Sequence, residues 1–376
     1  MLDLLIISHT EHFQTEEGDI VGWEPTIREI NSLTLLFNKI YHIAPLYKTP
    51  PHKANCTYEK NIIFIPIIPT GGNNFIDKLK ILFFMPTNLI TIIKMIKKVD
   101  WIHFRSPTNL GLFVLPLLSL LRRKKKWVKY AGNWAQPEIP LSYAIQRWWL
   151  RNNIQKSMVT INGKWKQQPE HLISFFNPCF NDDELISANN IGNAKIFNFP
   201  LNFCFVGRLD TNKGYLQLVK ALEEITSASW INEINFVGGS DNDNFQKINT
   251  SNKLKIKYCG WLNREDLNII YQKSHFIILP SISEGFPKVL AEAGAFGCIP
   301  IVSDLSPINQ LIINDHNGFL LIDLSIDSIK ECLLQIPVKK NHLKEISKNI
   351  IKISHQFTYR KYTENLQKVI LSAQNN

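Results

Sequence analysis

Two glutamates are the residues of this sequence whose types and spacing point most directly to chemistry. Glu284 and Glu292 lie eight positions apart, on either side of a Gly-Phe-Pro run. Proline suits a first helical position because its φ is fixed and it has no N–H to satisfy there. We therefore expect Glu284 in a loop and Glu292 inside the following helix. The exposed N–H groups and the positive dipole of that helix end favour an anion, so the pattern predicts a ligand with hydroxyls and phosphates, such as a sugar nucleotide.

The residues around Glu292 are small or apolar, from Val289 to Ala295. A helix that is apolar on most sides is largely buried, and a buried carboxylate without a partner is costly. Taken alone, Glu292 also fits a solvated surface charge. Its apolar neighbours favour a functional role.

A second cluster of charged residues lies upstream, where an apolar run over 203–206 leads into Gly207 and Arg208. Lys213 and Gly214 follow and open a predicted helix that ends near Glu224. An arginine can hold phosphate oxygens in a bidentate fork and a lysine adds a point charge, so this turn suits a diphosphate. Solvated surface cations are the alternative. About 75 residues, or two to three βα units, separate this cluster from the glutamates.

Together the two clusters resemble the signature of family 4 glycosyltransferases, retaining sugar-nucleotide enzymes of the GT-B fold. The resemblance implies an α/β chain of two Rossmann-like domains that face each other across a cleft. The expected domains are 1–176, which binds the acceptor, and 177–357, which binds the nucleotide sugar, with a C-terminal helix over 358–373 that crosses back to the first.

The same resemblance assigns roles to individual residues. It implies that Glu284, Arg208 and Lys213 are catalytic. The expected donor contacts are Glu292, Gly285, Phe286, Pro287, Leu290, Gly207 and Gly22. The donor is expected to be a UDP- or GDP-sugar, with no metal ion and no further cofactor.

The first half of the chain matches the family less closely. Gly22 lies in a segment, Gly18–Pro25, where related enzymes place a glycine-containing loop before a helix, here expected over Thr26–Asn38. His103 and Arg105 end a predicted strand where the family has His-x-His. Asn133 follows the next strand, where many relatives carry a histidine near the reacting sugar. These three residues are the candidates for acceptor contacts, although His103 also fits a structural histidine.

Strand-like runs alternate with helical patterns in both halves, which favours parallel sheets with crossover helices. The strands expected in the first half are 4–8, 40–44, 61–67, 101–104, 127–130 and 158–161. Those expected in the second half are 202–206, 233–237, 255–258, 275–279, 299–303 and 319–322. A polar stretch between them, Asn177–Asn193, is the predicted interdomain region.

Positive charge is concentrated in the first half. Residues 1–175 hold 22 Lys and Arg against 12 Asp and Glu, which is the whole formal excess of +10. The densest run, Arg122–Lys126, follows the apolar segment Leu110–Leu121, and the segment Ile81–Lys98 combines aromatic residues with lysines. Apolar residues beside cations suit a protein that contacts an anionic membrane. The alternative is a core helix whose C-terminal dipole the cations complement. No nucleic-acid-binding signature accompanies the run.

The overall composition bounds the class of protein. A chain of 376 residues exceeds the usual size of a single core and predicts two domains. The six cysteines have no metal-ligand spacing, and no run is long enough to span a bilayer. The first residues predict a buried strand and not a signal peptide. We therefore expect a cytoplasmic enzyme at the inner face of the membrane.

One motif points elsewhere. Asp241 and Asp243 form an Asp-x-Asp, the metal-binding signature of the other glycosyltransferase fold, but in a polar stretch typical of a solvated loop.

The function expected from these observations is transfer of a sugar from a nucleotide-sugar donor to a glycan or lipid-linked acceptor, in the biosynthesis of cell-surface polysaccharide or lipopolysaccharide. The alternative is a non-catalytic subunit that binds a nucleotide sugar or a glycan on the same scaffold. A nicotinamide dehydrogenase is disfavoured because Gly-x-Gly-x-x-Gly follows neither first strand.

Overall fold

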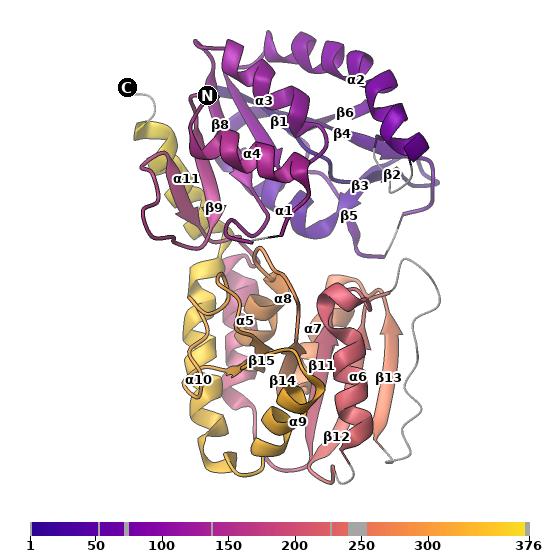
Figure 1. Ribbon diagram of the computed structural model, residues 1–376, viewed down its shortest axis with the longest axis vertical. Coiled ribbons are helices and arrows are strands. Elements are labelled where there is room, and N and C mark those ends of the chain that lie inside the picture. Colours follow the sequence, from indigo (N-terminus) through magenta and orange to yellow (C-terminus); the bar gives the residue numbers. More distant parts are fainter. Residues whose placement is uncertain are drawn as a thin grey trace. The chain divides into compact units, whose positions relative to one another are not determined.

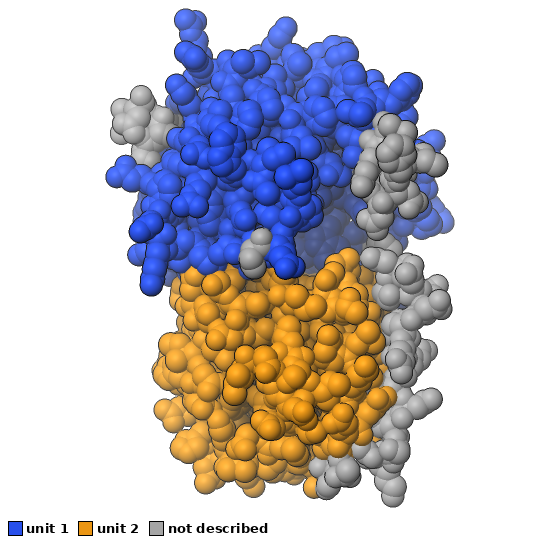
Figure 2. All heavy atoms as spheres, in the orientation of Figure 1, with its two compact units in different colours: residues 1–176, 360–376 blue, residues 177–359 orange. Residues whose placement is uncertain are grey.

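The computed structural model describes residues 2–51, 53–70, 75–136, 138–225, 228–239 and 254–372. The chain divides into two compact units (Figure 2). Unit 1 consists of residues 1–176 and 360–376, and unit 2 consists of residues 177–359. Each unit is an α/β domain built on a mainly parallel sheet (Figure 1), which confirms the predicted fold class.

Within its described residues, unit 1 contains a ten-stranded sheet in the order β10-β9-β8-β7-β1-β4-β2-β3-β5, with β6 also paired to β4. The strands are β1 (Leu2–Ile7), β2 (His12–Gln14), β3 (Ile20–Trp23), β4 (Phe37–Tyr47), β5 (Asn55–Thr57), β6 (Ile62–Ile67), β7 (Trp101–Ser106), β8 (Lys125–Tyr130), β9 (Met158–Asn162) and β10 (Leu172–Phe175). The helices are α1 (Glu24–Ser32), α2 (Phe75–Ile96), α3 (Gly111–Leu120), α4 (Leu141–Arg151) and α11 (Tyr359–Ser372).

The two faces of this sheet carry separate cores, because successive side chains of a strand point to opposite faces. From β1, Leu5 and Ile7 pack in the core that α2, α3 and α4 cover. Leu4 and Ile6 pack in the other core, with residues of α1 and α11. The predicted C-terminal helix is thus present, and it contributes Tyr362, Leu366 and Ile370 to unit 1, at the four-residue spacing of one helical face.

Unit 2 has a six-stranded parallel sheet in the order β13-β12-β11-β14-β15-β16. The strands are β11 (Leu201–Val206), β12 (Ile231–Val237), β13 (Lys255–Gly260), β14 (Phe276–Leu279), β15 (Ile299–Ser303) and β16 (Phe319–Leu321). The helices are α5 (Asp182–Ala194), α6 (Tyr215–Glu224), α7 (Arg264–Lys273), α8 (Lys288–Ala295), α9 (Ile326–Gln335) and α10 (Leu343–Ser354).

The strand order of unit 2 reverses between β11 and β14. The chain runs from β11 to β12 and β13 on one side, and then returns to β14 on the other side of β11. In open α/β sheets, ligands bind at the carboxyl ends of the strands at such a switch point. The loops that follow β11 and β14 are therefore the expected place for a ligand in this unit.

The prediction of an interdomain region over Asn177–Asn193 is wrong. Most of this stretch forms α5 within unit 2, and the units divide between residues 176 and 177. Asn181 accepts a hydrogen bond from the backbone of Glu184, whose side chain accepts one from the backbone of Asn181, a reciprocal cap that starts the helix. Polar residues on the outer face of a capped helix account for the composition that suggested a linker.

The helix predicted over Thr26–Asn38 is too long. α1 ends at Ser32, a short 3₁₀ turn follows over Leu33–Leu35, and Phe37 already begins β4. Phe37 is buried and pairs with Leu2 of β1, so tertiary packing decides its conformation. The strands β2, β3, β5 and β10 were not predicted; each has only three or four residues, and none is a continuous apolar run such as the equally short β14.

Gly22 also lies elsewhere than expected. It sits within β3, opposite His12 of β2, and not in a loop. A Cβ at this position would lie 2.7 Å from the His12 ring and 2.9 Å from Ile27. Glycine is required here because an imidazole packs against the strand. The placement of Gly22 in a loop is therefore wrong, while its contact with the donor stays a prediction.

The basic run is only partly solvated. Lys126 is buried, and its Nζ donates to the carbonyls of Leu118 and Leu121 at the C-terminal end of α3. Burial lowers the pKa of Lys126. Arg122 and Arg123 are exposed. Lys126 therefore caps the C-terminal end of α3, as the alternative predicted, while Arg122 and Arg123 form an exposed basic surface.

A buried ionic cluster joins α1, the sheet and α11 in unit 1. Glu29 Oε1 accepts from Arg105 Nη1 at 2.7 Å, from Lys129 Nζ at 2.6 Å and from the Tyr362 hydroxyl at 3.2 Å. The Glu29 charge raises the pKa of Arg105 against the opposing effect of burial. Arg105, predicted as an acceptor contact, is thus engaged in an ion pair that holds the layers of unit 1 together.

We expect Glu29→Ala to lower the free energy of unfolding by about 3–5 kcal/mol, because it leaves two buried cations without their shared carboxylate. Urea denaturation measures the change. Glu364→Ala, on the exposed side of α11, should change it by less than about 0.5 kcal/mol. Equal effects of the two substitutions would contradict the stabilising role of the cluster.

Candidate active site

The loop after β11 is shaped by a side-chain cap and a left-handed glycine. Asp210 Oδ1 accepts from the Lys213 backbone N–H at 2.9 Å, which closes a 3₁₀ turn over Thr211–Lys213. Gly214 follows with φ +70°, and α6 begins at Tyr215. A left-handed residue at this point redirects the chain sharply, so Lys213 is held at the carboxyl edge of the sheet.

The loop after β14 is locked onto this turn. The Ile282 backbone N–H donates to the Asn212 carbonyl at 2.8 Å. A Cβ at Gly214 would lie 1.8 Å from the Pro280 carbonyl oxygen, so only glycine allows the two backbones to approach so closely. The loops of the two strands that flank the switch point are therefore one structural element.

This contact brings together two of the three residues predicted to be catalytic. Lys213 Nζ lies 2.5 Å from Glu284 Oε1, and Ser281 Oγ donates to the same oxygen at 2.7 Å. The Glu284 side chain is 7% exposed and the Lys213 side chain 24%. Among the contacts of the described residues, only Oε1 of Glu284 is used, which leaves Oε2 able to accept from a ligand hydroxyl.

Arg208, the third predicted catalytic residue, lies on the same loop as Lys213. Its Nε is 3.2 Å from Asp210 Oδ2, and its side chain is 45% exposed. Asp210 thus holds Arg208 through one carboxylate oxygen and caps the 3₁₀ turn through the other. The loop carries two cations, of which the arginine is the more accessible.

Glu292 lies inside α8, as predicted, and is buried. It is paired with a residue that the sequence did not single out, Arg264, whose Nη1 lies 3.3 Å from Glu292 Oε1. Arg264 also contacts Glu184 at 3.1 Å and donates to the Cys179 carbonyl at 2.7 Å. Arg264 is the first residue of α7, and no local signal connects it to a glutamate 28 positions away.

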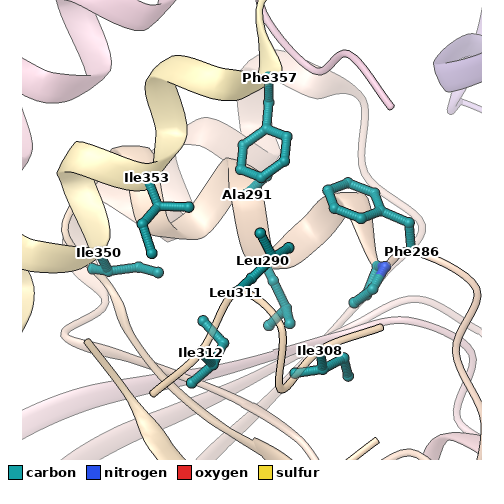
Figure 3. Close-up of a pocket in the computed structure, with 10 residues that line it drawn as sticks. Phe286, Leu290, Ala291, Ile308, Leu311, Ile312, Ile350, Ile353 and Phe357 are labelled. Carbon is teal, nitrogen blue, oxygen red and sulfur yellow. The ribbon is translucent and has the colours of Figure 1, made fainter. Parts of the chain in front are cut away.

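Phe286 and Pro287 of the Gly-Phe-Pro run line an apolar hollow. Helix α8 begins at Lys288, with Pro287 as its N-cap, one position later than predicted. Phe286, Pro287 and Leu290 line a small apolar hollow in unit 2, and the Phe286 ring lies 5.1 Å from that of Phe357 (Figure 3). The donor contacts predicted for these residues and for Gly285 stay predictions.

Two further predicted residues lie in unit 1. The His103 ring stacks on Trp127 at 3.7 Å, and its Nδ1 lies 3.2 Å from the Trp127 carbonyl. Burial lowers the pKa of His103 well below its usual value, aided by the charge of Arg105. His103 Nε2 is buried with no hydrogen-bond partner in the described part of the chain. Asn133 Oδ1 accepts from the Ala135 backbone N–H, and this hydrogen bond stabilises the turn in which Asn133 lies.

In the residues that the structure describes, no group of three or more His, Cys, Asp or Glu side chains is placed to hold a metal ion. Asp241 and Asp243 lie outside the described residues.

The region that carries this site matches a known family. Residues 191–353 match the family described as "Glycosyl transferases group 1". This segment lies within unit 2 and includes both loops of the switch point.

Individual proteins are also similar. The UDP-Gal:alpha-D-GlcNAc-diphosphoundecaprenol alpha-1,3-galactosyltransferase of Escherichia coli is 31% identical over 43% of this chain and 42% of its own length. The chain matches about a third to a half of the length of the curated relatives.

Solved structures share the fold over the whole chain. The sucrose-phosphate synthase from Thermosynechococcus elongatus has a TM-score of 0.74 at 15% identity and covers 100% of both chains. WaaG, a glycosyltransferase involved in lipopolysaccharide biosynthesis, has a TM-score of 0.65 at 12% identity and covers 98% of this chain and 99% of its own. The fold is thus that of GT-B glycosyltransferases.

We expect Gly214→Ala to separate the two loops of the switch point. The substitution combines left-handed strain with a clash against Pro280 and should cost roughly 3 kcal/mol or more. Gly260 is a matched control, because its φ is +66° and a Cβ there would meet no described atom within 4 Å. Gly260→Ala should cost about 1 kcal/mol. Equal losses in urea denaturation would show that the close approach does not constrain the site.

Proposed function

Because residues 191–353 match the group 1 glycosyl transferases, we propose that the protein is a retaining glycosyltransferase that uses a nucleotide-sugar donor. The observation that carries this proposal is the Lys213–Glu284 pair at the switch point of unit 2. A cation for phosphate and a carboxylate for sugar hydroxyls lie within one hydrogen bond of each other. A sugar joined to a diphosphate presents both groups at the same short spacing.

Donor binding would exchange the partners of this pair. The diphosphate takes Lys213 from Glu284, and the sugar hydroxyls replace the lysine at the carboxylate. Arg208, which is partly exposed on the same loop, adds a second charge on the diphosphate. We propose that these two cations supply the neutralisation and that no metal ion is required.

Transfer would break the bond between the sugar C1 and the diphosphate oxygen, and form a bond from C1 to the acceptor oxygen on the same face. Negative charge grows on the leaving diphosphate, where Lys213 and Arg208 stabilise it. The acceptor proton passes to the departing phosphate oxygen. Glu292, held by Arg264, is proposed to bind the ribose hydroxyls of the nucleotide.

A lipid-linked saccharide is the proposed acceptor. The E. coli relative is named for transfer of galactose from UDP-galactose to a GlcNAc-diphosphoundecaprenol. The corresponding proposal here is extension of a lipid-linked glycan in cell-surface polysaccharide biosynthesis at the inner face of the cytoplasmic membrane, with a UDP-sugar favoured over a GDP-sugar.

Unit 1 has a surface suited to that location. Helices α2 and α3 both end close to the N-terminal ends of the strands that follow them, β7 and β8. Lys124 Nζ joins the two connections by donating to the Val99 carbonyl. Exposed cations and apolar side chains gather at these helix ends. We name this surface the basic edge, and it comprises Ile93, Lys94, Lys97, Lys98, Leu120, Arg122 and Arg123. No helix within the described ranges has the length and apolar character needed to cross a membrane. We propose that the basic edge contacts anionic lipid.

We expect Lys213→Ala and Glu284→Ala each to lower turnover about 100-fold or more, since each removes a charge that acts on the transition state. The donor is first identified by thermal shift with UDP-, GDP-, ADP- and CMP-sugars, because a ligand of the native state raises the midpoint. Donor hydrolysis and transfer are then measured. Lys220→Ala, an exposed lysine on α6, serves as the control and should keep normal turnover.

Near-normal turnover in both variants would remove the catalytic assignment. Tight donor binding by the wild-type protein, without hydrolysis or transfer to any lipid-linked acceptor, would instead favour the non-catalytic alternative.

We expect reversal of Arg122 and Arg123 to glutamate to weaken binding to phosphatidylglycerol vesicles at least about thirtyfold, because the two lost cations contribute about 1 kcal/mol each and the two added carboxylates are repelled by the anionic lipid. Vesicle co-sedimentation measures this. Reversal of Lys348 and Lys352, two exposed lysines of unit 2, changes the net charge equally and should have little effect. An equal loss in both double variants would show that only net charge matters, and not the basic edge.

A further inference from the structure

A hollow of about 470 Å³ lies at the edge of the unit 1 sheet, between β3, β4, β5 and β6. Its apolar part is formed by Ile20, Leu46, Ile62, Phe64 and Pro66, together with the ring of Tyr58. The rings of Tyr58 and Phe64 are nearly parallel, with an interplanar angle of 26°. Its polar part comes from Asp19, Thr57, Glu59 and Lys60. The hollow is therefore partly aromatic and partly polar.

The Tyr58 hydroxyl points away from solvent into a buried network. It lies 2.5 Å from both His12 Nε2 and His42 Nδ1. His12 Nδ1 lies 2.8 Å from the Thr10 carbonyl, and His42 Nε2 lies 2.7 Å from Ser8 Oγ. The Thr10 backbone N–H donates to Ser8 Oγ at 3.2 Å, which closes the network.

The direction of each bond in the network follows from chemistry. Burial lowers the pKa of His12 to about 4 and that of His42 well below its usual value, so both rings are neutral at pH 7. A carbonyl only accepts, so His12 Nδ1 carries the proton and Nε2 accepts from Tyr58. The Tyr58 oxygen then accepts from His42 Nδ1, and His42 Nε2 accepts from Ser8. Every group is satisfied, so the Tyr58 ring is fixed without any ligand.

The charges at the hollow select the kind of ligand. Asp19 and Glu59 against Lys60 give a net charge of −1 at its polar part, which disfavours phosphates, nucleotides and anionic lipid headgroups. Glu59 Oε2 accepts weakly from Thr34 at 3.3 Å, while the Asp19 carboxylate has no partner among the described residues. Carboxylates accept from hydroxyls, and an aromatic ring packs on an apolar ring face. A neutral ligand with one apolar face and a hydroxylated edge fits both requirements.

We propose that this hollow binds a neutral pyranose ring, which lies on Tyr58 and Phe64 and donates its hydroxyls to Asp19 and Glu59. As a subsite for the sugars of an acceptor glycan, it rests on the proposed function. Binding itself does not depend on transfer, because the hollow lies wholly within unit 1 and Lys213 and Glu284 lie in unit 2.

The test is saturation-transfer NMR with the full chain and the methyl α-glycosides of glucose, galactose, N-acetylglucosamine and N-acetylgalactosamine. At least one glycoside should receive saturation from the wild-type protein. Phe64→Ala should weaken its binding about tenfold, because the ring contact is lost, and Asp19→Asn should weaken it severalfold without a change in packing. Phe83→Ala, at a 78% exposed phenylalanine of α2, should have no effect.

Absence of transfer to all four glycosides would overturn the proposal, as would undiminished binding in both hollow variants or an equal loss in Phe83→Ala. The thermal shift caused by the donor is measured on the same variants and should be unchanged. Glycoside binding at the hollow in a protein that neither hydrolyses nor transfers the donor sugar would refute the proposed function and leave this inference standing.

Discussion

The candidate active site depends on the close approach of two loops at the switch point of unit 2. The parallel strands β11 and β14 have their carboxyl ends at the same end of the sheet. The turn after β11 can approach the carbonyl of Pro280 only because Gly214 has no side chain. The bond from Ile282 to Asn212 then fixes the register of the two loops. Backbone contacts therefore hold the two loops together, and the Lys213–Glu284 ion pair is not needed to position them.

This arrangement allows the ion pair to discriminate between ligands as well as to join the two loops. Glu284 is nearly buried and Lys213 partly so, and removal of one partner alone would leave a poorly solvated charge. A free phosphate replaces only the carboxylate, and a free sugar replaces only the lysine. A ligand that carries both groups at the right spacing satisfies both charges at once, so the proposed donor would bind in preference to either of its fragments.

The sequence was sufficient to predict the parts of the molecule that depend on local pattern. All twelve expected strands are present. Most of them are buried parallel strands, which are continuous apolar runs bounded by polar residues. Lys213 and Glu284 were recognised because each lies in a short segment with a strong motif. Arg264 was not, since its contact with Glu292 is made by two helices whose packing no local pattern encodes. Gly22 was misplaced because the ring of His12, which it accommodates, belongs to a strand too short to recognise.

The two units differ in how their recognition is encoded. In unit 2, the proposed ionic recognition of a diphosphate and hydroxyls needs few charged residues on two loops, so it could be predicted from the sequence. In unit 1, the hollow is assembled from β3, β4, β5 and β6, and its aromatic platform is held by imidazoles from two further positions. A site that recognises its ligand by shape and neutral hydrogen bonds is built from many apolar and polar residues that form no short sequence motif. The chemistry of the proposed charged ligand could therefore be predicted from the sequence alone. The proposed neutral ligand could be inferred only from the surface of the folded unit.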